Sequence, residues 1–209
     1  MNKYWQEISN IFKYKNVWNF FYLNDGASSS QIESLELLTQ LQLPQSVRSF
    51  YQVHDGEIAF WKNNNQASSG LFFGWELLPI ELIIEIWQTW SDIQVEMNQE
   101  LAEDMSSYPP DHIKNLYANN KWIPLVHDRE GNHVGIDFDP DIRGIKGQVI
   151  LFGRDEDEKR LLANSFEELI EKFIYFIKNK EWDIDKSGNW KINEQDHYNF
   201  FHSYYRIKL

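Results

Sequence analysis

A chain of 209 residues, of which 42% are hydrophobic and 16% aromatic, is long enough for one core and too apolar for a disordered protein. Its 20 basic and 32 acidic residues give a net charge of −12, which disfavours nucleic acid and membranes as partners and favours a basic protein surface. The absence of cysteine excludes disulfides, and no run of about 20 apolar residues predicts a membrane span, so we expect a cytoplasmic monomer or weak dimer.

The N-terminal part of the chain predicts three helices. The second begins with a capping box of Ser30 and Glu33 and stops before Pro44. Pro44 suits the first turn of the third helix, which closes at Gly56. The first helix is indicated by apolar residues at helical spacing, namely Tyr4, Trp5, Ile8, Ile11 and Phe12.

The next part predicts two strands and a long helix. Residues 57–61, EIAFW, predict a strand, and residues 71–79, LFFGWELLP, a second strand-like segment. The polar residues 62–70 between them are typical of a loop. The longest helix then runs from Glu81 to about Asp104, with one apolar stripe.

The remaining strands are expected to form a meander. Residues 121–128, 133–139 and 148–155 each predict a strand, and the acidic turn 155–158 is expected to be a solvated tip. A last helix follows Ser165, which has Glu168 three residues later. This order predicts a single α+β domain, with a mostly antiparallel sheet packed by helices.

Three motifs occur in an order that resembles the SUKH superfamily. They are LPQSVRSFYQVHDGE at 43–57, GLFFGWELLP at 70–79, and the block from WIPLVHDREGN to SFEELIEKF at 122–173. That superfamily contains the fungal cell-wall regulators of the Smi/Knr type and many bacterial immunity proteins. The resemblance implies a SUKH-like domain at 30–180, with an N-terminal helical extension at 1–29 and an aromatic C-terminal extension at 181–209.

The resemblance implies a function in binding other proteins, without catalytic residues or a cofactor. The hypothesis favoured by the acidic composition is an immunity protein that neutralises a cognate toxin domain, which would be basic, with a nuclease as one candidate. The alternative is an intracellular regulator or scaffold of a cell-wall or signalling pathway. Neither hypothesis predicts an enzyme.

Aspartates recur in the segment GIDFDPDIRG, residues 135–144. Strand alternation predicts that Asp137 and Asp139 share one face, while Ile136 and Phe138 point into the core. Asp141 follows a proline, where the strand has ended. We favour a solvated rim that faces a partner over a magnesium or calcium site and over a pair of catalytic carboxylates.

Two tryptophans, Trp61 and Trp75, lie on either side of the polar loop 62–70. Tryptophan offers a large contact area at low entropic cost, which suits an interface. The predicted partner-binding region therefore consists of Trp61, Trp75, Asp137, Asp139 and Asp141.

Two further patterns raise the question of a metal. Residues 183–194, DIDKSGNWKINE, match the spacing of an EF-hand loop, but the alternating apolar residues favour a β-hairpin instead. His127 and His133 can approach one another across a turn, which is more typical of a cross-strand contact than of a metal site. We therefore predict no metal centre.

Overall fold

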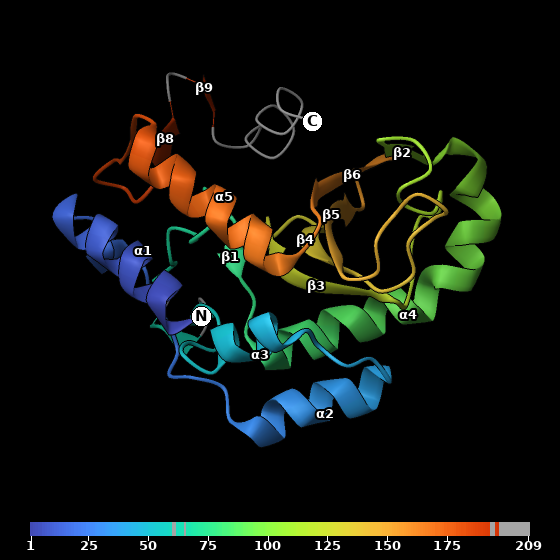
Figure 1. The fold of residues 1–209 in the computed structure, drawn as a ribbon, viewed down its shortest axis with the longest axis horizontal. Helices are drawn as coiled ribbons and strands as arrows, with labels where there is room; N and C mark the ends of the chain where they lie inside the picture. The colour runs from blue at the N-terminus through green and yellow to red at the C-terminus, as the bar shows by residue number, and fades with distance from the viewer. Residues whose placement is uncertain (60–61, 65, 193–194, 197–209) are drawn as a thin grey trace.

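The computed structural model describes residues 1–59, 62–64, 66–192 and 195–196. It confirms the predicted α+β fold, in which helices pack on a six-stranded, mostly antiparallel sheet (Figure 1). The helices are α1 (Asn2–Tyr14), α2 (Ser29–Thr39), α3 (Gln45–Tyr51), α4 (Ile80–Leu101) and α5 (Phe166–Asn179), with short 3-10 helices η1 (Trp18–Phe20) and η3 (Ala102–Asp104). The strands are β1 (Glu76–Leu77), β2 (Ser106–Tyr108), β3 (Trp122–His127), β4 (Asn132–Asp137), β5 (Gln148–Gly153), β6 (Glu158–Ala163), β7 (Trp182–Ile184), β8 (Trp190–Ile192) and β9 (Gln195–Asp196).

The main sheet has the order β1-β3-β4-β5-β6-β2. The predicted meander forms its centre, β3 to β5, with antiparallel neighbours. β6 extends the meander, and β2 pairs with β6 in parallel at the edge. Neither β6 nor β2 was predicted, because β2 has only three residues and β6 begins with the charged residues EKR, so that neither shows a clear alternation.

Both faces of the sheet are buried. Along β5, Val149 and Leu151 belong to the large core, while Ile150 and Phe152 belong to a second cluster on the opposite face. Residues of α1, α3 and α5 share the large core, and Trp90 in the second half of α4 packs against Phe152 on the other face. The two faces of this sheet are therefore both closed to solvent.

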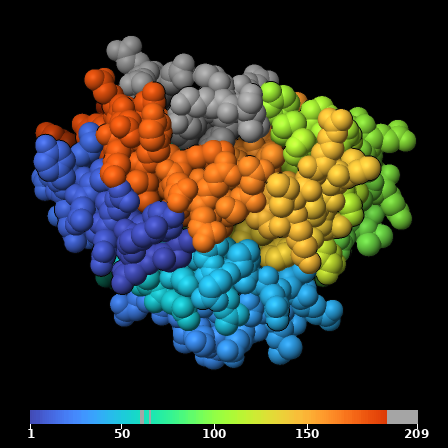
Figure 2. All heavy atoms as spheres, in the orientation of Figure 1, coloured from blue at the N-terminus to red at the C-terminus, as the bar shows by residue number. Residues whose placement is uncertain are grey.

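The N-terminal helix packs beside the last long helix. Figure 2 shows residues of α1 against residues of α5 on one surface of the molecule, where Tyr4 donates a hydrogen bond to Glu171 at 2.5 Å. Trp182 and Trp190 of the C-terminal hairpin enter the same core, with their ring centroids 4.9 Å apart. Both extensions thus share their apolar contacts with the central part of the chain.

Two predicted local features differ in the structure. The capping box of α2 is formed by Ser28 and Gln31 rather than by Ser30 and Glu33, because the backbone becomes helical two residues earlier. The turn 155–158 is not wholly solvated, since Glu156 is buried there, and so is Lys159 just after it. Burial lowers the pKa of Lys159 to about 8, and its ammonium donates to the Glu156 carbonyl at 2.5 Å.

The predicted strand at 57–61 is not found in its described part. Residues 60 and 61 lie outside the described residues, and Glu57 forms only an isolated bridge with Leu23. The segment 71–79 contributes the two-residue strand β1 and a bridge between Phe72 and Trp75.

Gly56 is required where the chain turns after α3. Its φ is +67°, and a Cβ there would lie 2.4 Å from the Pro79 nitrogen. We expect Gly56→Ala to lower the free energy of unfolding by about 2 kcal/mol or more, because positive φ and a backbone clash act together. Urea denaturation tests this against Gly147→Ala, which has φ +91° but nothing within 4 Å and isolates the cost of φ, about 1 kcal/mol. Equal losses in the two variants would contradict the role of the clash.

Candidate functional site

A pocket of about 480 Å³ lies where three loops meet. The loops are residues 66–70, the β3–β4 turn at 128–131, and the tip of the β7–β8 hairpin at 186–189. Its size is within the usual range for a binding site. The lining residues include Tyr22, Gln66, Ser68, Ser69, Trp75, Asp128, Arg129, Lys186, Ser187 and Asn189.

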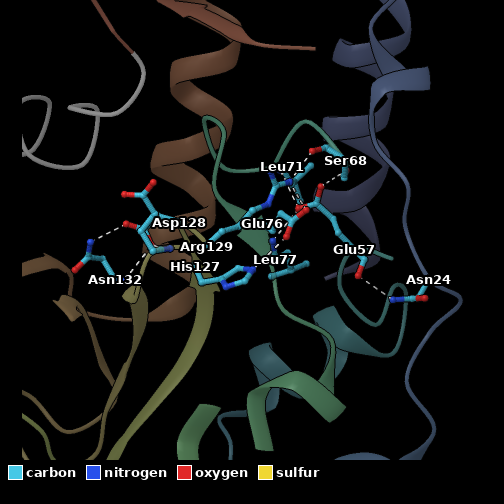
Figure 3. Close-up of polar contacts among 11 residues, drawn as sticks. Asn24, Glu57, Ser68, Leu71, Glu76, Leu77, His127, Asp128, Arg129 and Asn132 are labelled. Atoms are coloured by element: carbon cyan, nitrogen blue, oxygen red, sulfur yellow. Dashed lines mark hydrogen bonds and ion pairs between the residues drawn. The ribbon is translucent and has the colours of Figure 1, made fainter. Parts of the chain in front are cut away.

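A buried carboxylate holds the first loop in place. Glu57 accepts hydrogen bonds from the Ser68 hydroxyl and from the backbone N–H groups of Leu71 (2.9 Å) and Leu77 (2.8 Å) (Figure 3). Burial raises the pKa of Glu57 to about 7, although these hydrogen bonds oppose the shift. Glu57 thus connects the loop at 68–71 to β1.

The preceding residues of the HDGE motif fix the start of α4. Asp55 is buried and accepts a hydrogen bond from the Ile80 N–H at 2.8 Å, in the first turn of that helix. A carboxylate at this place also interacts favourably with the helix dipole. The HDGE motif, which is part of the family resemblance, therefore has a structural role: Asp55 binds the start of α4, and Glu57 binds Leu71 and Leu77.

A second carboxylate positions the arginine of the pocket. Glu76 accepts hydrogen bonds from His127 Nε2 at 3.1 Å and from Arg129, whose Nη2 also donates to the Ser68 carbonyl at 2.9 Å. Burial alone would raise the pKa of Glu76, but the hydrogen bonds from His127 and Arg129 outweigh it and lower this pKa. Figure 3 shows Glu57 and Glu76 close together, with Arg129 and Ser68 beside them.

The turn that carries Arg129 is closed by Asp128. The Asp128 carboxylate accepts from the N–H groups of Glu130 (2.7 Å) and Asn132 (3.0 Å) and from the Asn132 side chain (2.7 Å). Arg129 itself adopts φ +71°, a conformation that a non-glycine residue rarely takes. The turn is thus built to place this side chain against Glu76 and the pocket.

Asp137 does not lie on a solvated rim, and that expectation is wrong. Its carboxylate is completely buried and accepts hydrogen bonds from Trp122 Nε1 (3.1 Å), Gln148 Nε2 (2.8 Å) and the Asp139 N–H (2.8 Å). The predicted alternation is correct, since Ile136 points into the large core on the other face. The error arose because this antiparallel sheet is covered on both faces, whereas such sheets often leave one face in water.

The other two aspartates lie elsewhere on the surface. Asp139 is half exposed and forms an ion pair with Lys114 at 2.5 Å, and Asp141 accepts a hydrogen bond from the N–H of Ile142. Both follow the end of β4 that is opposite to the turn 128–131. Asp139 is therefore partly neutralised by a lysine, and neither aspartate lines the pocket.

The structure does not place the two predicted tryptophans together on an exposed surface. Trp75 is buried, with 3% of its surface exposed, and forms part of the pocket wall rather than an exposed anchor. Trp61 lies outside the described residues. The five predicted residues thus do not form one surface. The signal that was missed is the pairing of Glu76 in GWELLP with the arginine of DREGN.

The hairpin interpretation of 183–194 agrees with the described part of that segment. β7 pairs with β8, and Asp185 closes the turn by accepting from the N–H groups of Ser187 and Asn189. Residues 193 and 194 lie outside the described residues. Within the described part of the chain, no three His, Asp or Glu residues are grouped so that they could hold a metal ion.

We expect a calcium titration to be silent. Asp185 Oδ1 accepts from two backbone donors, its Oδ2 lies 3.8 Å from Lys191 Nζ, and Trp190 of the same segment is in the core. Isothermal titration of 1 to 5 mM calcium into the protein should therefore give only heats of dilution. Saturable heat that a Asp183→Asn variant abolishes would restore the EF-hand interpretation.

His127 and His133 make separate contacts in the structure and do not form a site together. His127 and His133 are cross-strand neighbours, but His127 bonds to Glu76 and His133 packs against the Trp90 ring. Neither nitrogen of His133 has a hydrogen-bond partner among the residues that the structure describes. Burial lowers the pKa of His133 to about 3, so this side chain is a neutral part of the core.

Comparison with known proteins gives a family. The model described as "SMI1 / KNR4 family (SUKH-1)" matches residues 26–172. The chain is 34% identical over 173 residues to the Schizosaccharomyces pombe "Cell wall biosynthesis/cell cycle regulator smi1", covering 78% of this chain and 33% of that protein. It is 27% identical over 216 residues to the Neurospora crassa "Glucan synthesis regulatory protein" (88% and 40%) and 25% identical over 205 residues to the Saccharomyces cerevisiae "Cell wall assembly regulator SMI1" (84% and 39%). The chain thus spans 33% to 40% of the length of these relatives.

Proposed function

This chain belongs to the SMI1/KNR4 family (SUKH-1), and from that premise we propose that it is a regulatory protein-binding domain acting in the control of cell-wall or glucan synthesis. The observation that carries the proposal is the family match over 26–172, together with relatives whose names describe regulators rather than enzymes. We propose that it acts inside the cell. None of the helices in the described residues is long and apolar enough to span a membrane.

The pocket at Arg129 is the place on this domain that best suits a partner. It combines a buried, hydrogen-bonded foundation of Glu57 and Glu76 with exposed polar side chains at its rim. Rigid support beneath adaptable polar groups is a property of preorganised binding sites. We therefore assign partner binding to this pocket rather than to the aspartates after β4.

The net charge still favours a partner with a basic surface. The chain has no lysine or arginine from residue 63 to residue 113, a stretch that includes α4. On α4, the carboxylates of Glu85, Asp92, Glu96 and Glu100 form no ion pair with any described residue. Such a face accelerates association with a basic partner, and the effect weakens with salt.

Deletion of the gene in the source organism tests the proposed regulatory function. Deletion of the gene is expected to increase sensitivity to an inhibitor of glucan synthesis, and re-expression of the wild-type chain should restore resistance. Purification of the chain from the same cells should yield a partner that, once made pure, forms a complex of defined stoichiometry. Unchanged sensitivity together with no reconstituted complex would contradict the proposal.

The immunity hypothesis predicts a different partner in the same purification. The expected partner is then a toxin domain that binds tightly at one-to-one stoichiometry and whose gene is adjacent to this one. Such a partner would favour the immunity function over the regulatory function. The relatives compared above favour the regulator, because their names refer to cell-wall or glucan control.

A further inference from the structure

The pocket at Arg129 is a cationic site on an acidic protein. Two positively charged side chains line it, Arg129 from the β3–β4 turn and Lys186 from the hairpin tip. Lys186 is exposed and forms no ion pair with any described residue, whereas the chain as a whole carries −12. With Asp128 as the carboxylate of the lining, the pocket has two cations and one anion on an otherwise acidic protein, and this local excess of positive charge favours an anion as the ligand.

We propose that this pocket binds a phosphorylated serine or threonine side chain within an otherwise basic segment of a protein partner. The inference rests on the proposed protein-binding function and specifies the chemistry of the partner.

The Arg129 side chain has N–H groups available to bind such a ligand. Its side chain is 45% exposed, and the hydrogen bonds to Glu76 and Ser68 use only Nη2. Nε and Nη1 have no hydrogen-bond partner among the described residues. Because a guanidinium presents five N–H donors in a fixed fork, it can hold Glu76 and a second anion at the same time.

The acidic groups around the pocket are already occupied. Asp128 accepts three hydrogen bonds inside its own turn, and Asp185 accepts two inside the hairpin. The groups left at the rim include the hydroxyls of Ser69 and Ser187, which make no hydrogen bond to other described residues. The pocket therefore offers donors to an anion more readily than acceptors to a cation.

The walls of the pocket are fixed to one another. A Cβ on Gly188 would lie 2.7 Å from Ser69 Oγ, so the hairpin tip and the loop 66–70 are in close contact. Trp190 Nε1 donates to the Gly70 carbonyl at 2.8 Å and joins the same two elements. Fixed walls lower the ordering cost of binding, since the donors converge before the ligand arrives.

A phosphoryl group matches this set of donors better than a carboxylate. It carries a charge of about −1.5 to −2 and three acceptor oxygens, which suit an arginine fork, a lysine and nearby hydroxyls. Because the chain as a whole carries −12, an acidic peptide would be repelled by the protein, whereas basic residues that flank the phosphoryl group would be attracted to it. A segment with one phosphate dianion among basic residues is attracted both by the cations of the pocket and by the net negative charge of the protein.

Calorimetry with synthetic peptides tests the proposal. An eleven-residue peptide of arginine and alanine with a central phosphoserine is expected to bind at least tenfold more tightly than the same peptide with serine. In ¹H–¹⁵N spectra of the full chain, it should shift the amides of Ser69, Arg129, Ser187 and Gly188. Equal affinity for the serine peptide, or shifts confined to other residues, would overturn the proposal.

Two charge-reversal variants localise the binding. Lys186→Glu should weaken binding of the phosphoserine peptide at least tenfold, because it replaces an exposed cation whose side chain makes no hydrogen bond or ion pair with a described residue. Lys146→Glu is the control, since Lys146 is also exposed and lies in the β4–β5 loop beyond the opposite end of β4; its affinity should stay within twofold. Equal effects of the two variants would show only a general charge effect and would overturn the site.

Further peptides separate the sources of affinity. A glutamate peptide that binds as tightly as the phosphoserine peptide would overturn the phosphoryl assignment, and tight binding with neutral flanking residues would overturn the basic segment. Inorganic phosphate should compete only at millimolar concentration. If the partner recovered from cells binds Lys186→Glu and the wild type equally, the pocket assignment fails while the regulatory function stands.

Discussion

Replacing Asp137 by alanine is expected to lower the free energy of unfolding by about 3 kcal/mol or more. The substitution would leave Trp122 Nε1, Gln148 Nε2 and the Asp139 N–H without their acceptor. Each buried donor that loses its partner costs about 1–3 kcal/mol. Urea denaturation followed by tryptophan fluorescence measures the loss, with the slope of the transition checked for two-state behaviour.

Asparagine at position 137 is expected to be only a partial rescue. Its oxygen can accept from Trp122 and Asp139, but its amide would then face the Gln148 amide, and two donors cannot bond. Gln148 cannot rotate without loss, because its other contacts are to the His112 carbonyl (2.8 Å) and the Ile145 N–H (3.0 Å).

Asp141→Asn is the matched control. Its side chain lies in the loop after the same strand, and it should change the free energy of unfolding by no more than about 0.5 kcal/mol. A loss at position 137 no larger than that at position 141 would contradict the buried network. An effect of Asp137 substitutions on partner binding therefore has to be separated from unfolding.

Glu57→Gln is expected to remove part of the pH dependence of stability without unfolding the protein. The glutamine oxygen can accept from the N–H groups of Leu71 and Leu77, and its amide can donate to the Ser68 hydroxyl. Glu57→Ala, in contrast, removes the same pH dependence and also leaves both backbone donors unsatisfied, which should cost about 3 kcal/mol more than the glutamine variant.

The sign of the pH effect follows from the raised pKa. Glu57 has a pKa of about 7 in the folded protein and 4.5 as its ordinary value, so the folded state binds the proton more tightly. The stability that protonation contributes is fully present below pH 4.5 and is lost as the pH rises through 7. Integrated over that interval, the contribution is up to about 3 kcal/mol.

The comparison of wild type with Glu57→Gln isolates this contribution. Asp137, with a pKa raised to about 6 by burial, adds a similar trend, whereas His133, with its lowered pKa, adds an opposite one. Both effects are common to the two proteins and cancel in the difference. Wild type should gain stability relative to the variant as the pH falls from 8 to 5, and a constant difference over this range would contradict the assignment.

Patterns within the sequence were sufficient for most of the elements. Apolar residues at helical spacing placed α1, α4 and α5, because one buried stripe on a helix leaves a regular trace in the chain. The meander β3–β5 was found from short apolar runs separated by turn residues. β2 was missed because three residues cannot establish an alternation, and β6 was missed because its first three residues are charged.

Patterns in the sequence did not predict which charged residues are buried. Alternation predicts which residues share a face of a strand, and it did so correctly for Asp137 and Ile136. Whether that face meets water depends on other segments of the chain, since Trp90 of α4 and Ile113 pack against it. Glu57 and Lys159 are also buried, although their types suggest exposure.

By itself, the sequence determined the fold class, the family resemblance, the acidic character and the positions of the long helices and central strands. These properties follow from local propensity and periodicity, which each segment carries alone. Only the tertiary structure decided that Asp137 is internal and that Arg129 and Lys186 line one pocket. Those outcomes depend on contacts between separate elements, such as Arg129 with Glu76 53 positions away and Asp137 with Trp122 15 positions away, and no local pattern records such contacts.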